Sequence, residues 1–222
     1  MSVVLAYVHP GSVTHTFMQS VVGVLSSDRA DQRITGVLPI RFRPSGICDA
    51  RNQGVSAFLK TGADWLWFAD TDMGFLPDTL CQLVDAADPV ERPVVGALCF
   101  GVREEAEDGF GGFRTRTFPT LHLWSDAAKT FLDIPYVPES QLVRVDGTGT
   151  ACILIHRSVL EAVREEYGPV WFHTVRDGGG APLGEDLSFC YRLRTLDIPV
   201  HVHTGIPTTH QKTQWVREAP SL

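Results

Sequence analysis

The sequence has no apolar run that approaches the roughly 20 residues needed to cross a bilayer, and its start lacks the basic region and apolar core of a signal peptide. It also lacks a CxxC pair, because its five cysteines are scattered and odd in number. Reduced, mostly buried thiols are therefore expected rather than a disulfide framework. These absences favour a cytoplasmic protein without a transmembrane segment.

An excess of basic residues is also missing. The formal net charge of −7 argues against a broad nucleic-acid-binding surface, although two local basic pairs remain, Arg41 with Arg43 and Arg114 with Arg116. Neither G-x-G-x-x-G nor G-x-x-x-x-G-K-[ST] occurs. A standard dinucleotide-binding fold and a P-loop are therefore unsupported.

Apolar runs and helical spacing alternate over the first hundred residues of the chain. The pattern predicts strands over 2–9, 33–40, 65–70 and 93–100, and helices over 13–27, 48–62 and 77–87. This alternation is typical of an α/β fold with a mostly parallel sheet. In such a sheet, ligands bind at the carboxyl ends of the strands.

The second half of the chain is less regular. It predicts strands over 119–124 and 198–205, strands and a helix within 142–163, and a helix over 187–196. Two charged or Gly-rich segments, 101–118 and 174–186, are expected to be mobile loops beside the functional site. Because no repeat or linker interrupts the chain, residues 1–222 are expected to form a single domain.

Two carboxylates, Asp70 and Asp72, follow the most apolar strand in "WLWFADTD". Residues two apart in an extended segment project to the same side, so both side chains can converge on one point. Close carboxylates repel, and dehydrating them is costly unless a cation compensates. Mn²⁺ or Mg²⁺ is the natural partner. The alternative is a turn in which Asp70 caps a helix and Asp72 is solvated.

The order of apolar strand, D-x-D, Pro-containing turn and helix in "WLWFADTDMGFLPDTL", with "ARN" upstream, resembles the GT-A glycosyltransferases. The resemblance is to family 2-like enzymes, with features of the Anp1-type mannosyltransferases. It covers nearly the whole chain and implies a Rossmann-like mixed sheet with helices on both faces. It also implies that Asp72 binds the metal directly and that Asp70 lies at the metal or the donor ribose.

Further segments resemble the nucleotide-binding parts of these enzymes. "CDARNQGVSAFL" is similar to their Arg-Asn helix, which implies that Arg51 and Asn52 lie beside the nucleotide; for Arg51 the alternative is an ion pair on the flank of a helix. "YVHPGSV" resembles the opening nucleotide-binding turn, which implies contacts from Pro10 and Gly11. His210, after the last predicted strand, corresponds to a third metal or pyrophosphate ligand.

"PLGEDLSFCYRLRTLDIPV" resembles the family segment G-E-D-x-x-F-x-x-R, whose Asp is the catalytic base in inverting members. The resemblance implies that Asp186 is the base and that Glu185 assists beside it. The structural alternative for Asp186 is a helix N-cap. Gly147 and Gly149 correspond to the acceptor side of the cleft, or are plain turn glycines. The Q-x-x-R-W segment of processive enzymes is absent, which favours transfer of a single sugar.

These motifs predict a Mn²⁺- or Mg²⁺-dependent, inverting transferase that uses a nucleotide-diphosphate sugar, with a UDP-sugar favoured. The acceptor is left open: a glycan, a protein side chain, a small metabolite, or a hydroxymethylated DNA base, as phage-encoded enzymes of this size modify. A nucleotidyltransferase and a catalytically silent nucleotide-sugar-binding module remain as alternatives. Against the first, "VHPGSVTHTF" contains no Lys or Arg.

Overall fold

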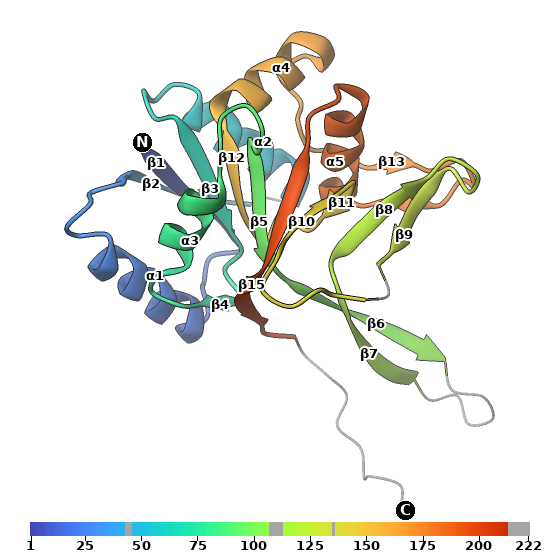
Figure 1. The fold of residues 1–222 in the computed structure, drawn as a ribbon, viewed down its shortest axis with the longest axis horizontal. Helices are drawn as coiled ribbons and strands as arrows, with labels where there is room; N and C mark the ends of the chain where they lie inside the picture. The colour runs from blue at the N-terminus through green and yellow to red at the C-terminus, as the bar shows by residue number, and fades with distance from the viewer. Residues whose placement is uncertain (43–45, 107–112, 135, 213–222) are drawn as a thin grey trace, which may run out of the picture.

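The computed structural model describes residues 1–42, 46–106, 113–134 and 136–212. A central sheet has the strand order β10–β15–β5–β12–β3–β1–β2, and β4 pairs with β15 beyond that path (Figure 1). Its strands are β1 (Val3–His9), β2 (Ile34–Arg41), β3 (Trp65–Ala69), β4 (Met73–Phe75), β5 (Val94–Leu98), β10 (Leu142–Val145), β12 (Cys152–His156) and β15 (Val200–His210). Parallel pairing joins β2, β1 and β3, and also β5 and β15, but β12 runs antiparallel between β3 and β5. The sheet is therefore mixed.

Helices cover both faces of this sheet (Figure 1). One face packs against α1 (His15–Ser27) and α3 (Thr79–Ala86), and the other against α2 (Ile47–Phe58), α4 (Arg157–Tyr167) and α5 (Glu185–Thr195). Because successive strand residues point to opposite faces, Trp65 and Trp67 of β3 pack with the first helix pair, while Leu66 and Phe68 pack with the second group. Two-sided burial explains why the strand sequence is continuously apolar.

Among the described residues, three smaller sheets lie outside the central one, and two of them fall in the segments expected to be irregular, 101–118 and 174–186. They are built from β6 (Phe100–Ala106) with β7 (Phe113–Pro119), β11 (Gly147–Thr148) with β8 (Leu121–Ser125) and β9 (Thr130–Asp133), and β13 (Val175–Arg176) with β14 (Pro182–Leu183). Both segments therefore contain strands that the sequence did not predict, whereas their expected mobility stays a prediction. Residues 107–112, between β6 and β7, lie outside the described part of the chain.

Side chains fix both hairpins. Arg103 of β6 donates to both oxygens of Asp133, at 2.6 and 3.1 Å, and stacks over Phe118 with its Cζ 4.2 Å from the ring centroid. In the β13–β14 turn, Asp177 Oδ1 accepts the backbone N–H groups of Gly179 and Ala181 at 3.0 and 2.8 Å. Each segment thus has contacts that offset the conformational entropy lost on ordering it.

The long strand β15 changes partners along its length. Residues Val200–His203 pair with β5 in parallel, and after a register shift Thr208–His210 pair with β4 in an antiparallel ladder. The backbone N–H of Gln211 then donates to the carbonyl of Asp72 at 2.8 Å. This ladder places the end of β15 beside the turn that follows β3. In the described residues, no helix is both long and apolar enough to cross a bilayer.

Candidate functional site

A cavity of about 400 Å³ opens where the carboxyl ends of β1 and β3 meet. The β1–α1 connection supplies one wall, including Pro10, and the turn after β3 supplies Asp70 and Asp72. Lys212, just past the end of β15, closes another side. The cavity lies where ligands bind in sheets of this type, so it is the candidate functional site.

The turn at the end of β1 has a positive φ at Gly11, a backbone conformation that glycine adopts readily. Gly11 has φ of 132°, a region that other residues rarely adopt, and a Cβ there would lie 3.6 Å from Arg41 Nη2. Thr14 then caps α1 by accepting the N–H of Phe17 at 3.1 Å, while its own N–H donates to the carbonyl of Thr71 at 3.0 Å. Pro10 and Gly11 therefore lie in a turn that is tied to the D-x-D segment.

Asp72, which lines the cavity, faces His210, although 138 positions separate the two in the sequence. The Nε2 atom of His210 lies 3.1 Å from Asp72 Oδ2, and its Nδ1 atom lies 2.7 Å from the carbonyl oxygen of Phe100. A carbonyl only accepts, so Nδ1 carries the proton, and in a neutral imidazole Nε2 then presents a lone pair to a carboxylate. Two acceptor atoms at this distance require a second proton or a metal cation between them.

Charged neighbours stabilise the ionised form of Asp72. Burial opposes ionisation, but hydrogen bonds from His210 and from Lys212, whose Nζ lies 3.0 Å from Oδ2, lower the pKa of Asp72 to about 2. For His210, burial lowers the pKa, but the bonds to Asp72 and to Phe100 outweigh it and raise the pKa above its usual value. Without a metal, the imidazole and the lysine thus neutralise this carboxylate.

Asp70 belongs to a second cluster, centred on Arg51. The Arg51 side chain is 1% exposed, and its Nη2 atom lies 3.1 and 3.2 Å from the two oxygens of Asp70. The same Nη2 is 3.7 Å from Asp186 Oδ1, and Nε is 3.9 Å from Glu185 Oε1. The rings of Phe68 and Phe172 enclose the guanidinium, with centroids 5.7 Å from Cζ in both cases.

This cluster has more negative than positive charge, because one guanidinium serves three carboxylates. Burial, with repulsion from Asp186 and Asp72 added, raises the pKa of Asp70 although Arg51 opposes the shift. Burial also raises the pKa of Glu185, assisted by Asp186 and opposed by Arg51. The expected contact of Arg51 with the donor is not supported by this enclosed position; Arg51 orients carboxylates instead. The alternative in which Asp70 caps a helix is wrong, since Asp78 is the N-cap of α3.

Asp186 lies in the first turn of α5, facing the start of β12. Its Oδ1 accepts the hydroxyl of Thr150, and a Cβ at Gly149 would lie 3.7 Å from its Oδ2. The N-cap of α5 is Gly184, so the interpretation of Asp186 as the cap is wrong. Its second carboxylate oxygen is therefore next to a backbone position without a side chain.

Asn52 has a role that the sequence motif did not predict. Its Oδ1 accepts the backbone N–H groups of Trp171 and Phe172 at 2.8 and 2.9 Å, and its Nδ2 donates to the Phe172 carbonyl at 2.8 Å. These bonds hold the 171–172 segment against α2. The expected contact between Asn52 and a nucleotide therefore has no support from its geometry.

The residues at the cavity fit a cation that shares its coordination with a bound ligand. Among the described residues, no group of three or more His, Cys, Asp or Glu side chains is arranged to hold an ion. Asp72 and His210 supply one carboxylate oxygen and one imidazole nitrogen, a donor pair that suits Mn²⁺ better than Mg²⁺. Asp70, expected as a further ligand, is directed at Arg51 instead. A ligand with oxygen donors would have to complete such a site.

Two residues of the site were missed in the sequence. Lys212 follows His210 by two positions, so extended geometry directs both to the same side, and this spacing was a usable signal. Thr150, which holds Asp186, gave no signal, because its partner is on a helix 36 positions later.

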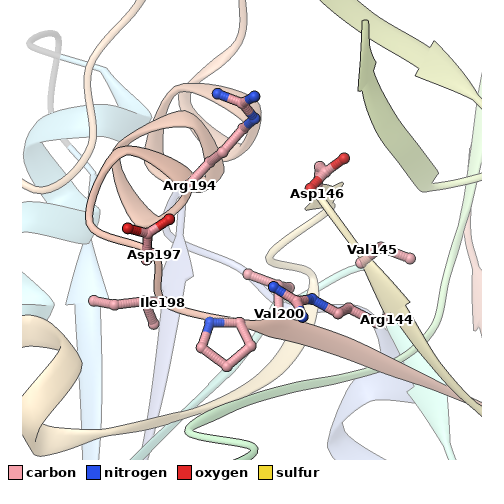
Figure 2. Close-up of a pocket in the computed structure, with 8 residues that line it drawn as sticks. Arg144, Val145, Asp146, Arg194, Asp197, Ile198 and Val200 are labelled. Carbon is pink, nitrogen blue, oxygen red and sulfur yellow. The ribbon is translucent and has the colours of Figure 1, made fainter.

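A separate cavity of about 240 Å³ lies at the opposite edge of the sheet, where β15 begins (Figure 2). Arg194 and Asp197 reach it from α5 and the turn that follows, and Arg144 and Asp146 from β10 and the residue after it. Its charges are balanced, and it contains none of the residues singled out by the motifs.

Comparison with known proteins identifies the fold. The sequence matches no known family description and no curated protein. The structure of the A197 protein of STIV is similar, with a TM-score of 0.57 and 16% identity over 96% of this chain and 87% of that chain. GalNAc-T7, solved with UDP, GalNAc and Mn²⁺, has a TM-score of 0.58 and 13% identity over 94% of this chain, which spans only 43% of the GalNAc-T7 chain. Such low identities establish the fold alone, and on these similarities and the mixed, doubly covered sheet the chain has the GT-A fold.

Proposed function

We propose that the protein is a metal-dependent glycosyltransferase that moves one sugar from a nucleotide-diphosphate sugar to an acceptor hydroxyl. The observation that carries the proposal is the pairing of a carboxylate with an imidazole, Asp72 Oδ2 and His210 Nε2, 3.1 Å apart beside the cavity in a GT-A fold. The neighbour GalNAc-T7 was solved with UDP and Mn²⁺, which supports a UDP-sugar and a divalent cation as the ligands.

The cavity residues have distinct roles in donor binding. Val8, Val13 and Pro10 offer an apolar wall to the nucleoside, and Asp72 with His210 would hold the cation. When bound, a divalent cation supplies Lewis-acid stabilisation of the charge on the departing diphosphate. The ammonium of Lys212 lies 3.0 Å from Asp72 and could bind a phosphate oxygen of the donor in place of that carboxylate.

Asp186 is the proposed catalytic base. Arg51 and Thr150 fix its Oδ1, which leaves Oδ2 beside the backbone of Gly149, where an acceptor hydroxyl can approach. As the acceptor oxygen forms its bond to the anomeric carbon, the bond to the diphosphate breaks and the hydroxyl proton passes to Asp186. A single displacement of this kind inverts the anomeric configuration. Glu185, whose Oε1 lies 3.9 Å from Arg51 Nε in the same cluster, is the proposed assisting carboxyl beside Asp186.

Two arginines of the β6–β7 hairpin are paired with carboxylates, which weakens the case for a DNA acceptor there. Arg116 lies 3.5 Å from Glu105 across the β6–β7 hairpin, and Arg103 is paired with Asp133. Arg43 and the side chain of Arg114 lie outside the described part of the structure. A glycan, protein or small-metabolite hydroxyl is the better-supported acceptor class.

Substitution of Asp72 tests the metal site. Asp72→Asn replaces an anionic ligand by an amide. Loss of a residue that only supports a metal ligand weakens metal binding about 10–100-fold, so a larger loss of Mn²⁺-dependent UDP affinity is expected for Asp72→Asn. Calorimetry with UDP in the presence and absence of Mn²⁺ measures the effect, and the thermal midpoint checks that the fold is intact. Asp197→Asn, in the cavity at the opposite edge, is the matched control and should bind like the wild type.

Unchanged UDP affinity in Asp72→Asn would rule out Asp72 as a ligand. Release of nucleoside diphosphate from UDP-sugars, with GDP- and dTDP-sugars as comparison, then separates the possible activities. A transferase releases nucleoside diphosphate slowly even without its acceptor, whereas a nucleotidyltransferase or a silent binding module does not.

A further inference from the structure

A third cavity, of about 440 Å³, lies on the side of α5 away from the central sheet. The β8–β9 hairpin forms one wall and the β13–β14 hairpin the other. Its apolar surface comes from Trp124, Val175, Leu183 and Tyr191, and its rim carries Lys129, Arg176 and Asp177. This cavity, here called the aromatic groove, has no role in the donor site described above.

The aromatic side chains of the groove are held in fixed orientations. Trp124 and Tyr191 pack with ring centroids 5.0 Å apart, and Phe131 packs edge-on against Trp124 at 5.2 Å. The indole Nε1–H of Trp124 donates to Asp126 at 3.0 Å, so its polar atom is already satisfied. Trp124 and Tyr191 nevertheless remain half-buried rather than fully covered. A rigid, partly exposed aromatic surface is suited to a ligand with an apolar face.

The two hairpins meet at a tight contact that shapes the groove. The backbone N–H of Gly178 donates to the Lys129 carbonyl at 3.0 Å, and a Cβ at residue 178 would lie 2.3 Å from Lys129 Cβ. Only glycine fits at that position. The opposite walls are therefore joined at one end, which makes the groove a formed feature rather than a gap between independent hairpins.

The rim of the groove is polar and carries two cations, Lys129 and Arg176, and one carboxylate, Asp177. Lys129 Nζ lies 3.9 Å from Asp126, Arg176 donates to the Gly180 carbonyl at 2.6 Å, and Asp177 accepts backbone N–H groups. A surface for a polyanion would instead present clustered cations without acidic partners. Donors and acceptors together around an apolar floor suit a neutral ligand with many hydroxyl groups, since each hydroxyl both donates and accepts.

The helix α5 connects the groove to the proposed catalytic base. Leu183 precedes Asp186 by three residues, and Tyr191 follows it by five, which places Tyr191 about 7.5 Å along the helix axis and about 140° around it from Asp186. Leu187, between them, packs in the same cluster as Phe131 and Leu183. A chain-like substrate that reaches Asp186 from the β8–β9 side would pass this groove.

We propose that the aromatic groove is a saccharide-binding subsite that holds a sugar of the acceptor, so that the acceptor is a neutral glycan. This inference rests on the proposed transferase function and narrows its acceptor class. Arg194 already lies over the Trp124 ring, with its Cζ 5.4 Å from the centroid. The C–H face of a sugar ring therefore packs on Tyr191 and on the part of Trp124 that stays exposed, and the hydroxyl edge meets Lys129 and Arg176 at the rim.

Binding of neutral oligosaccharides tests the proposal. Wild-type protein saturated with UDP and Mn²⁺ is titrated with maltotriose, chitotriose and mannotriose by calorimetry, and at least one of them is expected to bind saturably. Tyr191→Ala should weaken that binding about five- to tenfold, because the stacking surface is reduced. Trp124→Leu is a second variant, and Tyr167→Ala, outside the groove on α4, is the matched control. UDP–Mn²⁺ affinity and UDP-sugar hydrolysis should be unchanged in all three variants.

Each contrary result has a distinct meaning. Wild-type protein that binds UDP with Mn²⁺ but none of the three saccharides at millimolar concentration overturns the groove assignment and leaves the transferase function intact. Binding of a single-stranded oligothymidylate that Tyr191→Ala abolishes also overturns it, in favour of a nucleic-acid acceptor. Failure of the wild type to bind UDP with Mn²⁺ contradicts the proposed function itself, whatever the saccharides do.

Discussion

Replacing Arg51 by methionine is expected to lower the free energy of unfolding by about 3–5 kcal/mol, the cost of removing one partner from a buried ion pair. Methionine fills much of the same volume between Phe68 and Phe172, but Asp70, Glu185 and Asp186 then repel one another without a compensating charge. Urea denaturation at neutral pH, followed by circular dichroism, measures the change.

The deficit of Arg51→Met should shrink as the pH falls. The pKa of Glu185 is already raised in the wild type, and removing the guanidinium raises it further, so the folded state takes up a proton before the unfolded state does. A carboxyl whose pKa is raised on folding makes the protein more stable as the pH falls through that raised value. The matched control is Arg157→Met, because Arg157 donates to the carbonyls of Ala63 and Thr61. A loss below about 1 kcal/mol at neutral pH would contradict the role assigned to Arg51.

Substituting Asp186 by asparagine is expected to lower sugar transfer by about 10²–10⁴-fold, the usual contribution of a general base, while UDP–Mn²⁺ affinity stays near the wild-type value. Asparagine keeps an oxygen that accepts the Thr150 hydroxyl, so the geometry at Gly149 is retained and only the proton acceptor is lost. Single-turnover transfer and calorimetry on the same samples separate chemistry from binding.

Glu185→Gln is the matched comparison for Asp186→Asn. The Glu185 carboxylate lies 3.9 Å from the Nε atom of Arg51, whereas Asp186 also accepts the Thr150 hydroxyl, so a smaller loss of transfer is expected than for Asp186. Transfer near the wild-type rate in Asp186→Asn would show that the base lies elsewhere. A larger loss in Glu185→Gln than in Asp186→Asn would assign that role to Glu185.

Local sequence patterns predicted the first half of the fold well. The strand at 65–69 and the carboxylates after it were recognisable because two-sided burial makes the strand wholly apolar and ends it abruptly at Asp70. The direction of β12 was not predictable, since the run over Cys152–His156 is equally apolar whichever way it runs. The β6–β7 hairpin was missed because its alternation is mostly between charged and polar residues, which carry no period-two apolar signal.

The sequence predicted which residues belong to the candidate site better than it predicted how they are arranged. Resemblance supplied Asp72, His210 and Asp186, but sequence spacing does not show which carboxylates surround a buried guanidinium. Arg51 was therefore expected at the donor, although it lies among Asp70, Glu185 and Asp186. Asn52 was assigned to the nucleotide for the same reason, because its partners at 171–172 are about 120 positions away.

The pairing of β4 with β15 affects the order in which parts of the protein fold. Asp72 is synthesised in the first third of the chain, and His210 follows 138 residues later in β15, the last strand of the described part of the chain. Closing so long a loop is slow compared with forming local structure. During synthesis, the early strands can therefore pair while the cation-binding pair is still incomplete, and competence to bind a metal becomes a late marker of the native state. In a refolding experiment, Mn²⁺-dependent UDP binding should consequently recover after the far-ultraviolet signal of the sheet and helices.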